Sequence, residues 1–249
     1  ATPVERVPVI MKLAINYSPA SAKLYLQGEI LIDAFKVPDW PNLVEEAAMI
    51  CAPAVHFSLQ AGNGSLAKAD WKLIDRLLAA TATPYVNLHL EAHTKNYPGI
   101  PADTQDPKHT SLVYENLLGD IKVVTNRYGV GRVIAENIPY YGPASEHLRP
   151  CVEPGVICRL LEESGIGLLL DISHARITAH YLGLSDEEYL RQLPTSRVCE
   201  MHIAGVHTLP GGELHDHLAM LPGDWSLLAW VLERIQHKEW GHPWLLAFE

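Results

Sequence analysis

Residues 167–174 read G-L-L-L-D-I-S-H, a short apolar run that ends in a carboxylate and is followed three residues later by an imidazole. A continuous apolar run of this length is typical of a strand buried on both faces of a parallel sheet. Similar runs end in a possible metal ligand at His56, His89, Glu136, His202 and Glu249. Acids and imidazoles at the C-terminal ends of parallel strands are typical of the catalytic face of a barrel.

Strand and helix patterns alternate along the chain. Strands are predicted at 12–17, 30–35, 53–58, 85–90, 132–136, 167–171, 198–203 and 244–249. Helical periodicity predicts helices over 41–50, 66–81, 110–127, 152–164, 185–192 and 225–237. Strands that are mostly followed by a helix favour a (β/α)8 TIM barrel, an α/β fold, over an open doubly wound sheet. The polar connections 91–109, 137–150 and 204–224 are then the loops that build the pocket.

The chain length suits one domain. A chain of 249 residues matches a single α/β barrel better than two small domains, so we expect one TIM-barrel domain over residues 11–249. Residues 1–10 lack the features of a signal peptide, and we interpret them as a leader or a cloning remnant. Because Glu249 directly follows a predicted strand, we expect a further C-terminal segment after it.

The composition excludes several classes of protein. A net charge of −10, with 19 scattered Lys and Arg residues, makes nucleic acid an unlikely partner, because phosphate binding needs clustered basic side chains. No apolar stretch approaches a membrane span, so we expect no membrane association. The four cysteines have no C-x-x-C spacing, which predicts free thiols in a reducing cytoplasm. The absence of G-x-G-x-x-G and P-loop sequences argues against a dinucleotide or ATP enzyme.

The strand-end residues are of the types that bind first-row metals, namely neutral imidazole and carboxylate. Asp171 and His174 lie across a strand-to-helix junction, although Asp171 alone could be a helix N-cap. His215 and His217 are two residues apart, on the same side of an extended segment. The candidate metal ligands are His56, His89, Glu136, Asp171, His174, His202, His215, His217 and Glu249, of which Glu136, His202 and Glu249 are the candidate catalytic residues.

The other histidines lack this strand-end placement. His93 and His207 lie just beyond candidate ligands and are intermediate cases, while Glu91 could support the site or be a loop charge. The remaining ones are expected to be solvated or satisfied locally: His109, His147, His180, His237 and His242.

The order of these candidate ligands resembles that of the xylose isomerase-like and endonuclease IV-like TIM-barrel superfamily. Its trinuclear members carry His, His, Glu, Asp-x-x-His, His, Asp-x-His and Glu. The second half, with L-L-L-D-I-S-H-A-R-I-T-A-H-Y-L-G at 168–183, E-M-H-I-A-G-V-H at 200–207 and H-D-H-L-A-M-L-P-G-D-W at 215–225, is similar to the multinuclear non-heme iron-dependent oxidases. Enzymes of that family modify cysteine residues in ribosomally made peptides.

The resemblance implies two or three divalent metal ions. His56, His89 and Glu136 would surround the first, with Glu136 reaching a second that is completed by Asp171, His202 and Glu249. The third would be held by His174, His215 and His217. Two positions depart from the pattern: His215 stands where an Asp is expected, with Asp216 beside it, and His174 stands where the oxidases usually carry Asn.

Three hypotheses of function follow. The first, which the second-half resemblance favours, is an iron-dependent oxidase of a peptide or small thiol substrate. The second is a zinc- or manganese-dependent sugar isomerase, epimerase or phosphoester hydrolase, because His and carboxylate suit iron, zinc and manganese alike. The third is a barrel without catalytic activity that serves as a binding protein. The sequence leaves the oligomeric state open.

Overall fold

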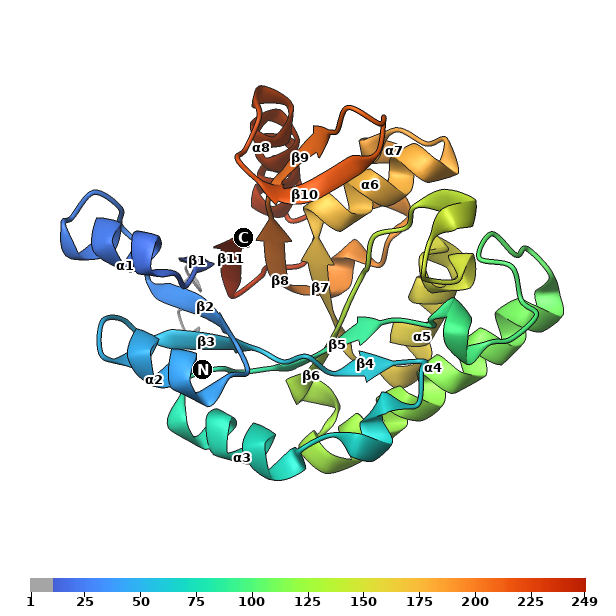
Figure 1. Cartoon of the computed structure of the whole chain (residues 1–249), viewed down its shortest axis with the longest axis horizontal. Helices are drawn as coiled ribbons and strands as arrows, with labels where there is room; N and C mark the ends of the chain where they lie inside the picture. The colour runs from blue at the N-terminus through green and yellow to red at the C-terminus, as the bar shows by residue number, and fades with distance from the viewer. Residues whose placement is uncertain (1–10) are drawn as a thin grey trace, which may run out of the picture.

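The structure is a computed structural model that describes residues 11–249, so the leader predicted at 1–10 lies outside the described residues. Strands and helices alternate along the chain (Figure 1). The strands of the main sheet are β1 (Lys12–Asn16), β2 (Ala34–Pro38), β3 (Pro53–His56), β4 (Gln60–Ala61), β5 (Val86–Leu90), β6 (Val133–Glu136), β7 (Gly167–Asp171), β8 (Val198–Ile203) and β11 (Leu245–Phe248). The α-helices are α1 (Pro19–Leu26), α2 (Pro41–Ala48), α3 (Trp71–Ala80), α4 (Pro107–Tyr128), α5 (Pro154–Ser164), α6 (Ile172–Leu182), α7 (Asp186–Gln192) and α8 (Pro222–Gln236).

Short elements lie in the connections between these strands and helices. An antiparallel hairpin is formed by β9 (Gly205–Thr208) and β10 (Leu214–Leu218). The 3-10 helices are η1 (Ser65–Lys68), η2 (Thr94–Asn96), η3 (Val130–Arg132), η4 (Gly142–Ala144), η5 (Arg149–Cys151) and η6 (Thr195–Arg197). Within residues 11–249, no helix combines the length and the apolar composition needed to cross a membrane.

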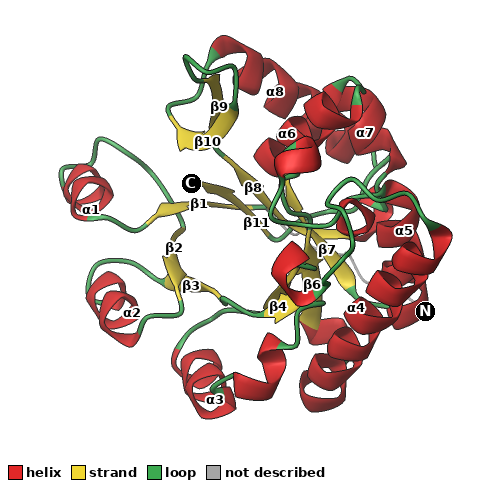
Figure 2. Cartoon of the chain, turned by 45° about the vertical axis from the view of Figure 1, so that its right-hand side comes forward, coloured by secondary structure: helices red, strands yellow, loops and turns green. Residues whose placement is uncertain are grey.

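The main sheet has the order β3-β2-β1-β11-β8-β7-β6-β5-β4, and each neighbouring pair in it is parallel. Its two edge strands are close in sequence, because residues 57–59 alone separate β3 from β4. The sheet therefore curls until its edges meet, and the helices surround it (Figure 2). The predicted (β/α)8 TIM barrel is confirmed.

Hydrogen bonds join β5 to the segment directly after β3, and β3 and β5 are not neighbours in the ladder order of the described sheet. We call this junction the seam. The buried amide of Asn87, on β5, accepts a hydrogen bond from the Phe57 backbone N–H (2.7 Å) and donates one to the Phe57 carbonyl (3.0 Å). Just above it, the His89 N–H donates to the Leu59 carbonyl at 2.9 Å. Backbone groups that a regular ladder would pair are therefore satisfied by one asparagine.

The core lies on both faces of the strands. On β2, Phe35 and Val37 point outward into the main core between sheet and helices, and Ala34 and Lys36 point into the barrel, because side chains alternate along a strand. A separate small cluster fills the barrel interior, and it consists of Ala14, Ala34, Ala54, Leu245 and Ala247. Lys36 lies one strand repeat above this cluster, toward the C-terminal ends of the strands.

Several predicted boundaries were wrong. The strand predicted at 30–35 begins at Ala34 and runs to Pro38. The helix predicted at 66–81 is broken into η1 and α3, because the side chain of Asp70 accepts a hydrogen bond from the Leu73 N–H and starts α3 anew. Helix α1 was not predicted, and it begins with a capping box between Ser18 and Ser21.

The connection predicted as the loop 204–224 is also more ordered than expected. It contains the β9–β10 hairpin, which stands next to the C-terminal edge of the barrel in both views (Figures 1 and 2). By contrast, the strand-to-helix junction predicted at Asp171 is present: Asp171 is the N-cap residue of α6, and Gly183 is its C-cap residue. The hairpin carries two of the predicted ligands, so its geometry decides part of the site.

Candidate metal centre

Strand register brings the predicted ligands to one level. In the β5–β6 ladder His89 lies directly opposite Glu136, and in the β7–β8 ladder Asp171 lies opposite His202. The backbone N–H of Glu249, directly after β11, donates to the Ile203 carbonyl at 3.0 Å. Parallel strands present their C-terminal ends at the same edge, so these side chains converge above the barrel.

The predicted ligands fall into triads, and the donor atoms of each triad lie within 4.8 Å of one another. We call these triads together the metal centre and describe them in three groups. The first group is His56, His89 and Glu136, and the third is His174, Asp216 and His217. The second group combines two triads that share His202: His56, His202 and Glu249, and Glu136, Asp171 and His202. Eight of the nine predicted ligands are therefore brought together, and His215 is the exception.

The first group has the spacing of a metal triad. His56 Nε2 lies 2.9 Å from His89 Nε2, and Glu136 Oε2 lies 3.5 and 3.3 Å from these two nitrogens. Metal bonds of about 2.1 Å place neighbouring ligands of one ion about 3.0–3.4 Å apart. Glu136 Oε2 is buried without a hydrogen-bond partner among the described residues. An unpaired buried carboxylate oxygen is costly, and a cation at this point would satisfy it.

Hydrogen bonds prepare these imidazoles as ligands. The His89 Nδ1–H donates to the Leu59 carbonyl at 3.1 Å, which leaves the lone pair of Nε2 directed at the triad. Burial lowers the pKa of His56 well below its usual value, and the neighbouring His89 and Lys36 lower it further. His56 is therefore neutral near pH 7, which is the protonation state that binds a metal.

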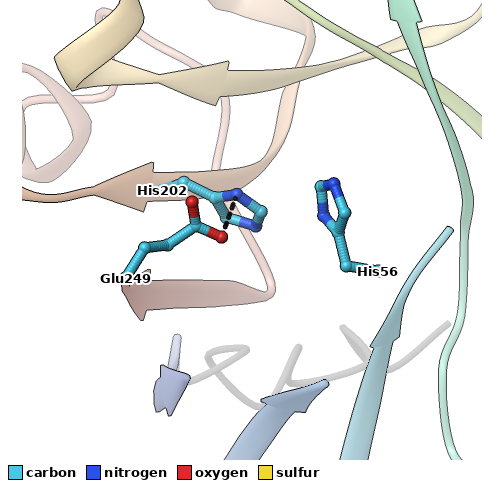
Figure 3. Close-up of side chains that lie close together, drawn as sticks. All are labelled: His56, His202 and Glu249. Carbon is cyan, nitrogen blue, oxygen red and sulfur yellow. Dashed lines mark ion pairs between the residues drawn. The ribbon is translucent and has the colours of Figure 1, made fainter. Parts of the chain in front are cut away.

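The second group is built on His202. His202 Nδ1 lies 3.1 Å from Glu249 Oε1, and the His56 ring faces His202 from the other side of the gap (Figure 3). On its far side, the His202 Nε2–H donates to Glu200 Oε1 at 2.9 Å. Glu200 is in turn paired with the buried ammonium of Lys36 and accepts a hydrogen bond from Trp244 Nε1 at 3.0 Å. The orientation of His202 is thus fixed by the buried carboxylate of Glu200, whose negative charge is balanced by Lys36.

The charges of this group are interdependent. Burial by itself raises the pKa of Glu200, but Lys36 and His202 outweigh burial and lower it to about 2. Burial lowers the pKa of His202, but Glu249 and Glu200 reverse this and raise it to about 10. Glu249 keeps its negative charge, because His202 holds its pKa well below the usual value despite burial. Without a metal, His202 is therefore an imidazolium between two carboxylates.

The third group joins α6 to the hairpin. The His174 Nδ1–H donates to the Asn137 carbonyl at 2.9 Å, and His174 Nε2 lies 3.3 Å from Asp216 Oδ2. Asp171 Oδ1 caps α6 at the His174 N–H (2.7 Å), and the Asp171 carboxylate also lies in the second group, where its role as a metal ligand stays a prediction. His217 Nδ1 lies 3.8 Å from Glu249 Oε2, which links the third group to the second.

A β-bulge explains which hairpin residues reach the centre. His215 pairs with His207 and Leu218 with Gly205, so that Asp216 and His217 together stand opposite a single residue. His217 has a left-handed backbone with φ 55°, a conformation that is uncommon for a residue with a side chain. Neighbouring residues of a regular strand point to opposite faces, but here Asp216 and His217 turn toward the same group. His215 is exposed and lies outside the three groups.

A cavity of about 300 Å³ opens onto the centre. The ligands His56, His89, Glu136, His174, His217 and Glu249 line it together with Asn16, Lys36, Val37 and Pro38. His217 is 56% exposed and lies at the mouth, whereas Glu136 is 2% exposed and lies at the floor. A molecule that enters the cavity therefore contacts these candidate ligands directly.

Sequence reasoning missed the residues that support the ligands. Glu200 and Lys36 were not singled out, although Glu200 precedes His202 by two residues and so lies on the same face of β8. Asn137 and Asn87 were also missed, and each hydrogen-bonds backbone groups of a neighbouring segment. A polar residue inside an otherwise apolar strand was the available signal in each case except Asn137, which follows β6.

The fold is that of the xylose isomerase-like TIM barrels, and the C-terminal edge of its sheet carries the candidate metal centre. The family model described as RiPP precursor modification enzyme MbnB/TglH/ChrH matches residues 42–242. The chain belongs to this family, as the resemblance in its second half indicated. The match extends across the first half as well, where the sequence resemblance is looser.

Curated relatives match over shorter segments. A UPF0276 protein of Caulobacter vibrioides (strain NA1000 / CB15N) is 33% identical over 108 residues, which are 42% of this chain and 38% of that protein. A UPF0276 protein of Bordetella pertussis is 38% identical over 53 residues, which are 21% of this chain and 18% of that protein. The chain thus spans well under half the length of these relatives.

Solved structures share the architecture at low identity. The 3-keto-D-glucoside 4-epimerase YcjR from E. coli superimposes with a TM-score of 0.58 at 14% identity, over 96% of this chain and 92% of that one. A family 2 AP endonuclease from Brucella melitensis gives a TM-score of 0.55 at 13% identity, over the same 96% and 92%. At such identities the likeness establishes the fold alone.

Proposed function

We propose that this protein is an iron-dependent oxidase that acts on a thiol-bearing peptide or a small thiol, with dioxygen as the oxidant. The observation that carries the proposal is the family match over residues 42–242, because that family modifies ribosomally made peptides. The metal centre supplies the chemical support, since its His and carboxylate ligands are a set that iron accepts.

The chain's own residues have distinct parts in this proposal. Iron ions bound by the three groups would supply the activation of dioxygen. Glu136 belongs to both the first and second groups, so its carboxylate would be a ligand of more than one ion. Lys36 and Glu200 keep His202 in one orientation from below. His217, at the exposed mouth of the cavity, would be the first ligand that a substrate meets.

Two exposed tryptophans near strands of the metal centre suit the binding of a peptide. Trp225 is 51% exposed and its ring packs against Phe248 at a centroid distance of 5.7 Å, directly before Glu249. Trp40 is 61% exposed and follows β2 at the C-terminal edge of the barrel. Exposed aromatic side chains beside a cavity are typical of peptide-binding surfaces.

The test is metal analysis followed by oxygen uptake. Protein purified without added metal is analysed for iron, zinc and manganese, then reconstituted with iron under reducing, oxygen-free conditions. We expect oxygen uptake when cysteine-containing peptides are added, and none with the Glu136→Gln variant or with serine-substituted peptides. Iron-loaded protein that consumes no oxygen with any thiol would reject the oxidase.

A zinc- or manganese-dependent sugar isomerase, epimerase or phosphoester hydrolase is the second candidate. It is favoured by His174, which joins Asp216 and His217 in the third group where the oxidases usually carry Asn. Purified protein that contains zinc or manganese and no iron supports this candidate. Cleavage of an abasic duplex would identify the hydrolase, although the net charge of −10 opposes binding to DNA.

A further inference from the structure

A second cluster of metal-ligating side chains lies outside the metal centre. It consists of Glu91, His93 and His147, and we call it the loop cluster. His93 Nε2 lies 2.9 Å from Glu91 Oε2, and His147 Nε2 lies 4.0 Å from the same oxygen. The three donor atoms lie within 4.8 Å of one another, and the loop cluster shares no residue with the three groups of the centre.

The backbone holds this cluster in shape. His93 and His147 face each other across an isolated antiparallel bridge between the loops 91–109 and 137–150. Hydrogen bonds extend the bridge on both sides, from the Thr94 N–H to the Glu146 carbonyl (2.8 Å) and from the Leu148 N–H to the Ala92 carbonyl (2.9 Å). The two imidazole rings lie 4.6 Å apart between centroids.

Strand alternation explains why Glu91 joins the two imidazoles. Residues two apart on an extended segment point to the same side, so Glu91 and His93 share a face. Residues opposite each other in a bridge also share a face, which adds His147. The side chains of the three are 12–16% exposed, so they are shielded but open to solvent on one side.

Two imidazoles and one carboxylate form a donor set that zinc uses when a fourth position is left to water or substrate. We propose that Glu91, His93 and His147 bind one divalent cation of the zinc type, which ties the loop 91–109 to the loop 137–150. The two edges that meet at Glu91 Oε2 are 2.9 and 4.0 Å long, and the longer one exceeds a tetrahedral edge of about 3.4 Å by only about half an ångström.

The cation would act on the walls of the pocket. Both loops follow strands that end in ligands of the metal centre, His89 on β5 and Glu136 on β6. An ion held across them would therefore fix two neighbouring loops relative to the cavity. His147, which sequence analysis expected to be solvated or satisfied locally, would then be a ligand.

The experiment counts bound zinc. Chelator-treated wild-type protein and the Glu91→Gln and His147→Gln variants are saturated with zinc, freed of excess by gel filtration and analysed for zinc per chain. We expect each variant to hold one zinc fewer than the wild type. The His237→Ala variant, which removes an exposed histidine, is the matched control and should keep the wild-type count.

A second measurement guards against misfolding. Circular dichroism in chelator should give both Gln variants a melting temperature close to that of the wild type, because glutamine keeps the size and polarity of the site. Zinc should then raise the melting temperature of the wild type more than that of the variants. Equal zinc counts in wild type and folded variants overturn the proposal, and the cluster is then a hydrogen-bonded clamp. Oxygen uptake does not enter the measurement, so the oxidase proposal stands or falls separately.

Discussion

Glu200 shows how a residue without contact to substrate can control the centre. Its carboxylate accepts the Nε2–H of His202, so the other ring nitrogen is directed at Glu249. The charge of Glu200 is stabilised by Lys36, buried beside it. A carboxylate of this kind sets the tautomer and the basicity of the imidazole that binds the metal.

The Glu200→Gln variant is therefore expected to bind metal about 10- to 100-fold more weakly, because the amide holds the imidazole less firmly and makes it less basic. Competition titration against a chelator of known affinity measures the change. Glu187→Gln, an exposed carboxylate on α7, is the control and should leave affinity unaltered. Unchanged affinity in Glu200→Gln would show that His202 is oriented by packing alone.

Metal binding should release protons. Burial lowers the pKa of His174, but Asp171 and Asp216 outweigh it and raise the pKa to about 10, and the pKa of His202 is raised to about 10 as well. Both are protonated near pH 7 without metal, and both must lose that proton to become ligands. Metal affinity is therefore expected to rise with pH up to about 10, and calorimetry in buffers of different ionisation enthalpy should detect about two protons released per chain.

The stability of the metal-free protein should change with pH in the opposite direction to metal affinity, falling as the pH rises. A histidine whose pKa is raised by folding stabilises the fold fully below its unfolded pKa and loses this effect as the pH rises through the folded value. The metal-free protein should therefore lose stability between about pH 7 and 10, which thermal unfolding measures. A binding enthalpy that is the same in all buffers would contradict the protonation states described for His174 and His202.

At the scale of elements, the β9–β10 hairpin places the third group. Gly205 packs so closely that a Cβ there would overlap the Ala219 carbonyl and come within 2.6 Å of the Leu218 carbonyl. Both contacts are backbone atoms just after Asp216 and His217, and they cannot move without shifting the hairpin. Glycine is required here by close approach of the chain.

Gly205→Ala is therefore expected to displace β10 and to lower the metal count by the ion of the third group, while the barrel remains folded. Metal analysis and circular dichroism together check this. Gly211→Ala is the matched control in the same hairpin, since a Cβ at Gly211 meets nothing within 4 Å. A full metal count in Gly205→Ala would show that the hairpin does not hold an ion.

Elements were predictable where pattern and chemistry agree. The apolar runs that end in His89, Glu136 and Asp171 are strands, because a strand buried on both faces has no polar alternation to obscure it. The β9–β10 hairpin was taken for a loop, since its largely polar sequence has no regular apolar alternation that would predict two paired strands. His215 was predicted from regular strand alternation to face the same side as His217. One extra residue in the bulge breaks this alternation, so His215 does not reach the metal centre.

At the scale of the whole molecule, Asn87 closes the barrel. Its side chain satisfies both backbone groups of Phe57 inside the seam, where a ladder is interrupted. The seam could not be predicted, because strand order around a barrel does not state where the edges meet. The barrel itself could be predicted, because it follows from eight apolar strand patterns that are mostly followed by a helix.

Asn87→Leu is expected to destabilise the fold by about 2–6 kcal/mol, because it leaves two buried backbone groups unpaired at about 1–3 kcal/mol each. Urea denaturation measures the loss. Asn96→Ala, an exposed asparagine with one long hydrogen bond, should cost less than about 1 kcal/mol and serves as the control. Equal stabilities of Asn87→Leu and wild type would mean that the seam is closed by packing.

The seam also gives the first group a mechanical part. His56 belongs to β3 and His89 to β5, so an ion bound by both would cross-link the two strands at the seam, where the ladder is interrupted. Hydrogen exchange followed by mass spectrometry should then show faster exchange in metal-free protein around Phe57 and His89 than in the paired strands β7 and β8. Removing the metal would weaken the barrel along the seam. Metal binding and closure of the barrel would therefore be coupled.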